Sequence, residues 1–250
     1  MAYALETIGL HRQFEGIVAS NNVSLAVAAG SRRALIGPNG AGKTTLINLI
    51  SGTLRPSSGA VVLDGEDITA RRPDERVRLG LVRTFQINQL FGGLTPLETI
   101  GLAVSERMGS GADWWRLVGR KPRVVDEIVD VLERFGLVDV MHAPTATLPY
   151  GKQRLLEIAL AIACRPKVLL LDEPAAGVPE AERRDLLDMI ATLPADVTVL
   201  LIEHDMDLVF SFADTITVLV NGTVFVEGPP DEVARDPRVK AVYLGEAYDG

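Results

Sequence analysis

The chain has 250 residues, of which 47% are hydrophobic, and a net charge of −8 at pH 7. This length allows one large α/β domain or two small ones, with enough apolar residues for a substantial core. No uninterrupted apolar run approaches the ~18–20 residues that a membrane-spanning helix needs, and no secretion signal marks the N-terminus, so we expect a soluble, cytoplasmic protein. Cys164 is the only cysteine, which excludes intrachain disulfides and cysteine-based zinc sites. The net negative charge argues against general nucleic-acid binding, although it does not exclude a local basic patch.

The first 36 residues contain short strand-like apolar runs separated by turn residues. These runs cover residues 5–10, 23–27 and 34–36. Their spacing is typical of a small antiparallel sheet, and we expect one at the N-terminus.

A complete phosphate-binding loop follows, with the sequence Gly-Pro-Asn-Gly-Ala-Gly-Lys-Thr-Thr at residues 37–45. The run 33–36 before it reads as a buried strand and the run 45–50 after it as a helix, which is the context that this motif requires. The glycines let backbone N–H groups point at phosphate oxygens, and the helix N-terminus adds partial positive charge. Lys43 would reach the β- and γ-phosphates, and the Thr44 hydroxyl would bind Mg²⁺. The loop therefore predicts a nucleoside triphosphate site, formed by Gly37, Pro38, Asn39, Gly40, Ala41, Gly42, Lys43, Thr44 and Thr45.

Beyond the loop, a strand at 60–63 and a turn at 64–65 precede a short polar helix and a strand-like run at 80–85. From about residue 88 to 147 the pattern becomes helical. The clearest helix spans 124–135, where apolar residues recur on one face and acidic residues on the other.

From residue 151 onward, helices and apolar strands alternate, which indicates a parallel sheet covered on both faces. We expect helices at 153–164, 180–192 and 205–212, and strands at 167–171 and 197–202. A hairpin around Asn221-Gly222 and short helices close the chain. The loop and this second block therefore belong to one nucleotide-binding core, with a helical insert between them.

The strand at 167–171 ends in two carboxylates, Asp172 and Glu173. Parallel strands bring their C-terminal ends to the ligand crevice, so an acid at this place can meet the Mg²⁺ of a bound nucleotide. Asp172 suits the metal, usually through water. Glu173 suits a general base for the attacking water. Solvated acids at a strand end are also common, but the upstream loop favours the functional interpretation.

His204 follows the strand at 197–202, at the same expected sheet edge as Asp172. Its ring could reach the γ-phosphate or the attacking water. The other histidines, His11 and His142, have no such setting and read as structural or exposed.

Several motifs together resemble the ATPase subunit of an ABC transporter. They occur in the order and at the approximate spacing of that family: GPNGAGKTT, Gln86 within RTFQ, LPYGKQR at 148–154, LLLDEP at 169–174 and His204. Finer features are similar to the ATP-binding subunits of branched-chain (hydrophobic) amino acid importers: GEDIT at 65–69, RTFQINQLF at 83–91, DEPAAG at 172–177, LIEHDM at 201–206 and the close at 243–246.

The resemblance implies an α/β fold: a P-loop NTPase ABC ATPase core with a parallel central sheet, an N-terminal antiparallel β subdomain and an inserted helical subdomain. The chain would be a single ABC ATPase domain over 1–250. Residues 1–87 and 148–250 would form the nucleotide-binding core, and 88–147 the helical insert.

The resemblance also implies roles for individual residues. Gln86 would link Mg²⁺ and the attacking water to the insert, which docks on the membrane permease in the family. Phe14 matches the aromatic that stacks on adenine, although an ordinary core phenylalanine is an equal interpretation. A loop at a helix N-terminus would cap the γ-phosphate of ATP held by a facing subunit, so that each site needs two chains. This partner-site motif comprises Leu148, Pro149, Tyr150, Gly151 and Lys152.

The motif departs from the usual Leu-Ser-Gly-Gly-Gln of the family. Pro149 replaces the serine, Tyr150 the first glycine and Lys152 the glutamine, while Gly151 is kept. Lys152 could supply compensating charge. Pro179, followed by Glu180, replaces the aspartate often found after Asp-Glu-Pro. These departures fit a heterodimer with inequivalent sites, and a homodimer stays open.

The resemblance therefore implies an ATPase that uses ATP and Mg²⁺ and lies on the inner face of the cell membrane. Its partners would be a second ABC ATPase subunit, transmembrane permease subunits and, indirectly, a periplasmic solute-binding protein, with no nucleic acid. Related importers carry urea, amides or aromatic acids, so the solute stays open. A soluble ABC ATPase acting on DNA or ribosomes and a regulatory module without turnover are the alternatives.

Trp114 and Trp115 either contact the permease or pack inside the insert.

Overall fold

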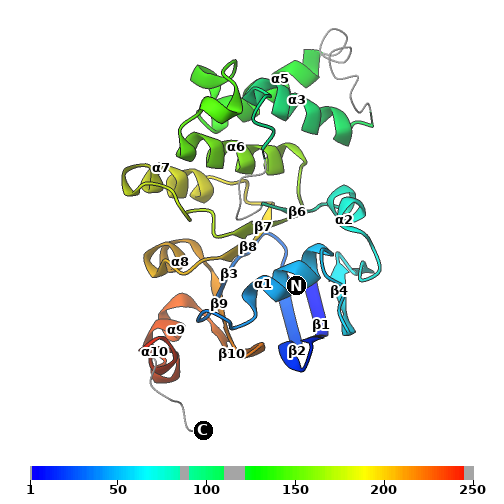
Figure 1. Ribbon diagram of the computed structural model, residues 1–250, viewed down its shortest axis with the longest axis vertical. Helices are drawn as coiled ribbons and strands as arrows, with labels where there is room; N and C mark the ends of the chain where they lie inside the picture. Colours follow the sequence, from blue (N-terminus) through cyan, green and yellow to red (C-terminus); the bar gives the residue numbers. More distant parts are fainter. Residues whose placement is uncertain (1, 85–89, 110–121, 245–250) are drawn as a thin grey trace. The chain divides into compact units, whose positions relative to one another are not determined.

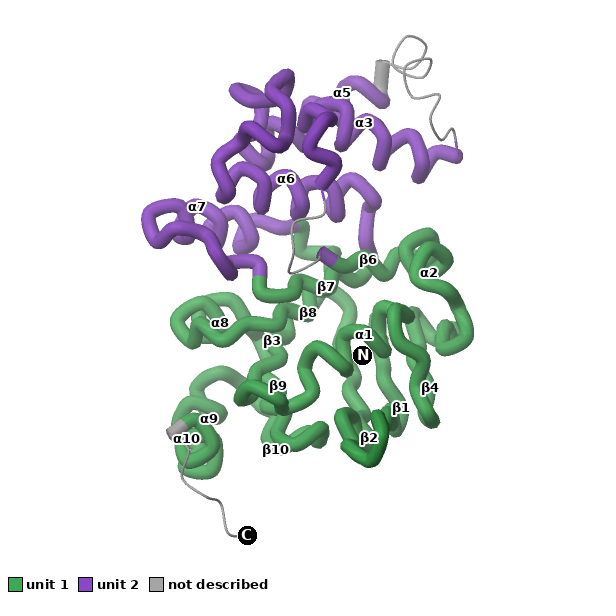
Figure 2. The backbone as a smooth tube through the Cα atoms, viewed as in Figure 1, with its two compact units in different colours: residues 1–83, 167–173, 194–250 green, residues 84–166, 174–193 purple. Residues whose placement is uncertain are grey.

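The computed structural model describes residues 2–84, 90–109 and 122–244. They form two compact units, drawn in different colours in Figure 2. The first unit comprises residues 1–83, 167–173 and 194–250, and the second comprises 84–166 and 174–193. Gln86, Trp114 and Trp115, to which the sequence assigned roles, lie outside the described residues.

The first unit begins with a four-stranded antiparallel sheet in the order β2-β1-β4-β5. Its strands are β1 (Tyr3–Phe14), β2 (Ile17–Ala28), β4 (Ser58–Leu63) and β5 (Glu66–Asp67). In β2, Val23, Leu25 and Val27 are buried in alternation, as expected of a sheet that packs one face on a core. In β1, where Leu5, Thr7 and Leu10 are buried, register shifts interrupt this alternation. The expected N-terminal antiparallel sheet is therefore present.

The same unit contains a six-stranded sheet in the order β10-β9-β3-β8-β7-β6. Neighbours from β9 to β6 run parallel, and β10 pairs antiparallel with β9 at the edge. Its strands are β3 (Arg32–Ile36), β6 (Leu81–Arg83), β7 (Val168–Asp172), β8 (Thr198–Ile202), β9 (Thr215–Val220) and β10 (Thr223–Gly228). The predicted parallel sheet is confirmed, but the assignment of 34–36 to the N-terminal sheet is wrong. β3 pairs with β8 and β9, because a strand buried on both faces belongs between parallel neighbours.

Five described helices belong to this unit (Figure 1). They are α1 (Lys43–Ser51), α2 (Pro73–Leu79), α8 (Met206–Phe212), α9 (Pro230–Arg235) and α10 (Pro237–Leu244). Helix α1 ends at Gly52, which has φ 80°, as at many helix C-termini.

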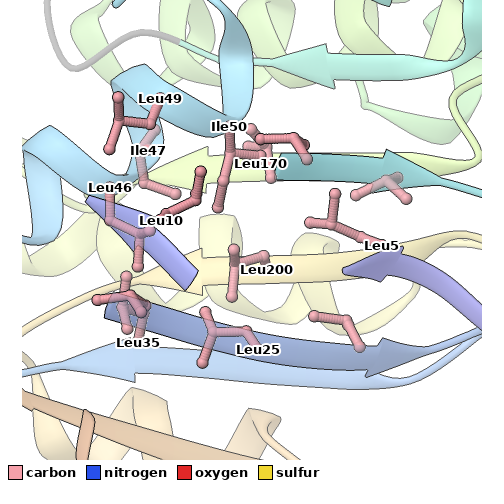
Figure 3. Close-up of a cluster of buried hydrophobic side chains, with 14 of the residues drawn as sticks. Leu5, Leu10, Leu25, Leu35, Leu46, Ile47, Leu49, Ile50, Leu170 and Leu200 are labelled. Carbon is pink, nitrogen blue, oxygen red and sulfur yellow. The ribbon is translucent and has the colours of Figure 1, made fainter. Parts of the chain in front are cut away.

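The main core of the first unit joins its two sheets through α1 (Figure 3). Leucines of β1 and β2, such as Leu5 and Leu25, meet Leu170 and Leu200 of the parallel sheet. Helix α1 adds Leu46, Ile47, Leu49 and Ile50, each at most 1% exposed. Burying a side chain of this size contributes about 1.5–3 kcal/mol, so the helix behind the phosphate loop is firmly anchored.

A smaller core involves other side chains of the same parallel sheet. Ile36 of β3 and Val218 of β9 pack with Val209 of α8, Val233 of α9 and Val239 of α10. The helices near the C-terminus are thus attached to the strand that leads into the phosphate loop.

The second unit is helical. Its described helices are α3 (Pro96–Arg107), α5 (Pro122–Arg134), α6 (Tyr150–Ala163) and α7 (Glu180–Ala191), with short 3₁₀ turns at Val138–Val140 and Thr145–Thr147. Helix α3 starts with a reciprocal capping box between Thr95 and Glu98. Helix α5 buries Val124, Ile128 and Leu132. The helix predicted at 124–135 is therefore present, and it buries the face that was predicted to be apolar.

This unit is larger than the insert expected at 88–147, since it also includes α6 and α7. The reason is packing: α6 contacts α3, α5 and α7, so the chain after residue 147 stays with the helices. Among the described residues, no helix is both long and apolar enough to cross a membrane.

Candidate nucleotide site

The phosphate loop joins β3 to α1 through glycines in the left-handed region of φ. Gly37, Gly40 and Gly42 have φ values of 151°, 80° and 99°. A Cβ at Gly42 would overlap with the carbonyl oxygen of Ala19 in β2, and a Cβ at Gly37 would overlap with that of Leu219 in β9. Glycine is therefore required at both places by conformation and by space.

Two other segments of the first unit hold the loop in place. The Gly222 N–H, in the turn between β9 and β10, donates to the Ala41 carbonyl at 2.9 Å. The Asn21 N–H of β2 donates to the Gly222 carbonyl at 2.8 Å. The sequence predicted the hairpin at Asn221-Gly222 but gave no sign that its turn supports the loop.

Helix α1 presents an uncapped N-terminus to the loop. Its N-cap is Gly42, which provides no side-chain acceptor for the first-turn N–H groups. Lys43 folds back, and its Nζ donates to the carbonyls of Gly37 at 2.6 Å and Pro38 at 3.1 Å. Asn39, Gly40 and Thr44 are exposed, Ala41 is buried, and Pro38 and Thr45 are intermediate. An uncapped helix end with an adjacent ammonium group is an arrangement suited to an anion.

Asp172 and Glu173 lie at the carboxyl end of β7, beside the end of β8. Asp172 pairs with Ile202 in the parallel ladder, and the Glu173 N–H donates to the Ile202 carbonyl at 2.9 Å. Asp172 is 3% exposed. Glu173 has φ 47°, a conformation that costs a non-glycine residue about 1–2 kcal/mol. Strain of this kind is concentrated at functional sites.

These carboxylates influence Lys43. Burial lowers the pKa of the Lys43 amine from its ordinary value, while the charges of Glu173 and Asp172 oppose part of that shift. The cation of the loop and the two carboxylates at the end of β7 therefore share one electrostatic environment.

His204 lies on the loop between β8 and α8, close to Glu173 and Glu203. Its Nδ1 is 3.8 Å from Glu173 Oε1 and 3.8 Å from Glu203 Oε2, and its side chain is 66% exposed. The buried Glu203 carboxylate accepts the His204 N–H at 3.0 Å. Asp205 caps α8 through the Leu208 N–H at 3.3 Å. The backbone on both sides of His204 is thus held, while its ring stays accessible.

The residues present fit a triphosphate with Mg²⁺. The N-terminus of α1 has no side-chain cap, Lys43 supplies positive charge, and Thr44 and Asp172 offer the oxygen ligands that Mg²⁺ prefers.

Phe14 is the last residue of β1, at the tip of the β1–β2 hairpin. It pairs with Ile17 across the turn, and its ring is stacked under the Arg12 guanidinium at 4.8 Å. The residue is 41% exposed, so it is no core phenylalanine. The same hairpin carries Ala19, which touches the phosphate loop at Gly42.

The motif at 148–152 forms the start of α6 in the helical unit. Leu148 is 6% exposed, and Pro149 is the N-cap. The Tyr150 hydroxyl donates to the Ala176 carbonyl at 3.2 Å. Lys152 donates to the Gly136 carbonyl and pairs with Asp139 at 3.2 Å, so its charge is engaged inside the unit. The Gly151 N–H donates to Glu182.

Sequence reasoning did not predict two residues near the loop and Asp172, namely Arg83 and Tyr243. Arg83 of β6 forms an ion pair with Asp172 at 2.8 Å. Burial raises the pKa of Tyr243, in α10, to about 12, and the backbone of Gly37 opposes part of that shift, so this phenol belongs to the surroundings of the phosphate loop. In the sequence, Tyr243 stood out only as part of the family-like close at 243–246, with no role assigned to it at this site.

A parallel sheet whose strand–loop–helix unit faces a buried aspartate defines a P-loop nucleotide-binding protein. The chain belongs to the ABC transporter family. A family model described as "ABC transporter" matches residues 20–176, and one described as "Branched-chain amino acid ATP-binding cassette transporter" matches residues 223–249.

Relatives of nearly equal length support this membership. The high-affinity branched-chain amino acid transport ATP-binding protein BraF of Pseudomonas aeruginosa is 40% identical, with 97% of this chain and 98% of BraF covered. LivG of Escherichia coli, described in the same words, is 38% identical with the same coverage. The ADP conformation of MJ1267, an ATP-binding cassette of an ABC transporter, matches with a TM-score of 0.83 and 32% identity over 98% of this chain and all of MJ1267. The predicted family and fold are confirmed, and the chain is an ABC ATPase.

Proposed function

We propose that this ATPase powers an importer of branched-chain or other hydrophobic amino acids. It would act in the cytoplasm, on the inner face of the membrane, with separate permease subunits and a periplasmic solute-binding protein. The support comes from BraF and LivG, which are both branched-chain amino acid transport proteins, and from the C-terminal match at 223–249. Residues 1–250 would form a single ABC ATPase domain.

In this proposal, ATP binds along the loop 37–45. The backbone N–H groups of the loop and of the first turn of α1 hold the phosphates. Lys43 leaves the carbonyls of Gly37 and Pro38 to reach the β- and γ-phosphates, and Phe14 stacks on the adenine. Thr44 and Asp172 would hold Mg²⁺, Asp172 through water. When bound there, Mg²⁺ would supply positive charge that offsets the negative charge of the phosphates.

Hydrolysis then needs a water placed for in-line attack. The Glu173 carboxylate orients this water and takes its proton. His204, with its ring 3.8 Å from Glu173, donates a hydrogen bond toward the γ-phosphate or the water. Gln86 would complete this set and link it to the helical unit.

A second ATPase subunit would complete the site. Residues 148–152 would cap the γ-phosphate of ATP held by that partner, through the N-terminus of α6. The partner is either a second copy or a related chain.

One observation carries the proposal: Lys43, Asp172, Glu173 and His204 lie near one another at one sheet edge. The chain that holds them is related to a transport ATP-binding protein over 97% of its length. The test is to purify the tagged chain from membranes of its own host and identify its partners. We expect permease subunits, and an ATPase activity that rises with a binding protein loaded with leucine. Urea, amides and aromatic acids serve as competing solutes. Recovery without any permease would contradict the transport function, and stimulation by another solute alone would contradict the substrate.

A further inference from the structure

Arg83 connects the strand that carries Asp172 to the helix that follows the phosphate loop. Its Nη2 donates to Asp172 Oδ2 at 2.8 Å. Its Nη1 donates to Asn48 Oδ1 at 2.6 Å and to Ser51 Oγ at 3.3 Å. Asn48 and Ser51 lie on α1, so a single guanidinium group joins α1 to the end of β7.

The fold brings these groups together from distant parts of the chain. Strand β6 pairs in parallel with β7, and Arg83 stands opposite Leu170, two residues before Asp172. The planar guanidinium has donors on two sides, so it can bind a carboxylate and an amide oxygen at once. A lysine has no such fork.

The ion pair is shielded from solvent, since the side chains of Arg83 and Asp172 are 10% and 4% exposed. A shielded pair of this kind keeps its two side chains in one arrangement. An exposed pair, in contrast, contributes little to stability. Arg83 binds Oδ2 of Asp172, so this ion pair does not itself occupy Oδ1.

The face of α1 that Arg83 binds is also the face of Thr44. Thr44, Asn48 and Ser51 are separated by four and then three positions, which places them along one side of a helix. An ion bound by both Thr44 and Asp172 needs these two side chains at a set spacing, because Mg²⁺ demands near-ideal octahedral geometry.

We infer that Arg83 is a positioning residue for the magnesium-dependent part of ATP binding. It fixes the Asp172 carboxylate relative to the Thr44 face of α1, and it uses Asn48 as the anchor. This inference rests on the metal role given to Asp172 in the proposed function. It adds a residue that contacts neither nucleotide nor metal.

The test compares ATP binding with Mg²⁺ and with EDTA, by calorimetry on the full chain. The ratio of the two dissociation constants measures the magnesium-dependent gain. In Arg83→Gln we expect this gain to fall about 10–100-fold, as for other partners of metal ligands, while binding in EDTA changes less than about twofold. Arg83→Lys, which can pair with Asp172 but lacks the fork, should keep an intermediate gain. Asn48→Ala should lower the gain with the ion pair intact.

Arg107→Gln is the matched control. Arg107 forms an ion pair of the same 2.8 Å length with Glu127, in the helical unit. Both dissociation constants should stay as in the unaltered chain. A role of Arg83 in folding alone would lower the melting temperature without changing the gain.

Asp172→Asn separates failure of the inference from failure of the proposed function. If it leaves the magnesium gain intact, the metal assignment of Asp172 is wrong. If it removes the gain while Arg83→Gln does not, only the inference on Arg83 is wrong. An increased gain in Arg83→Gln would make Arg83 a competitor of the metal and overturn the inference. Should Arg83→Gln fail to fold, an unchanged gain in both Arg83→Lys and Asn48→Ala overturns it as well.

Discussion

The carboxylate of Glu182 accepts a hydrogen bond from the backbone N–H of Gly151 at 3.0 Å, inside the helical unit. Gly151 lies in the first turn of α6 and Glu182 in the first turn of α7. A Cβ at Gly151 would collide with this carboxylate. The N-terminus of α6, an anion site by its dipole, therefore already holds a negative group of its own chain.

Glu182→Ala should have two effects. Loss of the capping bond should destabilise the protein by about 1 kcal/mol, visible in chemical unfolding. If α6 caps the ATP of a partner, removal of the competing carboxylate should also strengthen ATP-dependent dimerisation, measured by light scattering. Glu180→Ala, which removes an exposed acid from the same helix turn, should change dimerisation little. Weaker dimerisation of Glu182→Ala would mean that Glu182 supports the partner site.

Glu173→Gln tests the general base. The amide keeps the shape of the side chain but cannot take a proton, so hydrolysis should fall about 10²–10⁴-fold while ATP binding stays. The variant should accumulate as a closed ATP-bound dimer with its partner. Phosphate release and equilibrium binding measure the two properties. Unchanged hydrolysis would refute the assignment.

Gly42→Ala should disrupt the phosphate loop through a collision with the Ala19 carbonyl. Gly65→Ala is the matched control, because Gly65 has a similar φ of 80° but open space around its Cα. Both changes bear the conformational cost of about 1–2 kcal/mol. We expect only Gly42→Ala to lose ATP binding. Equal ATP binding by the two variants would show that the loop tolerates the added methyl group.

Phe14→Ala tests the adenine contact. Stacking of an aromatic side chain on a base contributes about 1–3 kcal/mol, so ATP affinity should fall between about 5-fold and 150-fold. Stability should change little, because Phe14 is 41% exposed. Ile17→Ala, at 73% exposure and directly opposite in the hairpin, should leave affinity unchanged. Equal affinity of both variants would assign the adenine contact to another residue.

The Glu127 carboxyl should make the stability of the folded protein depend on pH. Burial alone would raise its pKa, but Arg107 and Arg165 hold the pKa of this carboxyl below its ordinary value of 4.5. The folded state therefore binds the proton more weakly than the unfolded state, so the stabilisation is complete above about pH 4.5 and is lost as pH falls through the lowered pKa. Unfolding followed between pH 6 and 3 should show this loss. Glu127→Gln should be less stable at pH 6 and less sensitive to acid; an identical pH profile would contradict the assignment.

Much of the nucleotide site could be predicted because its parts are contiguous. The loop 37–45 carries its glycines, Lys43 and Thr44 in one run, and Asp172 and Glu173 directly follow an apolar strand. Helix α5 could be predicted from the period of its apolar residues. For 34–36, a short apolar run defined a strand but not its neighbours, and it was placed in the wrong sheet.

The contacts that support the site could not be predicted. Arg83 and Asp172 are 89 positions apart, and an arginine at the end of a short strand has no pattern that names its partner. The same holds for Gly222 beside Ala41, and for Glu182, which binds Gly151 from 31 positions away.

By itself, then, the sequence determined the order of the elements, the phosphate loop and the acids of β7, because local backbone needs and burial leave their mark on neighbouring residues. Only the tertiary structure decided which groups hold those parts in place. Strand order and register bring Arg83 to Asp172 and the β9–β10 turn to the loop, and packing of α6 against α7 brings Glu182 to Gly151. Such long-range pairs depend on the whole fold, since many residues elsewhere in the chain offer the same chemistry.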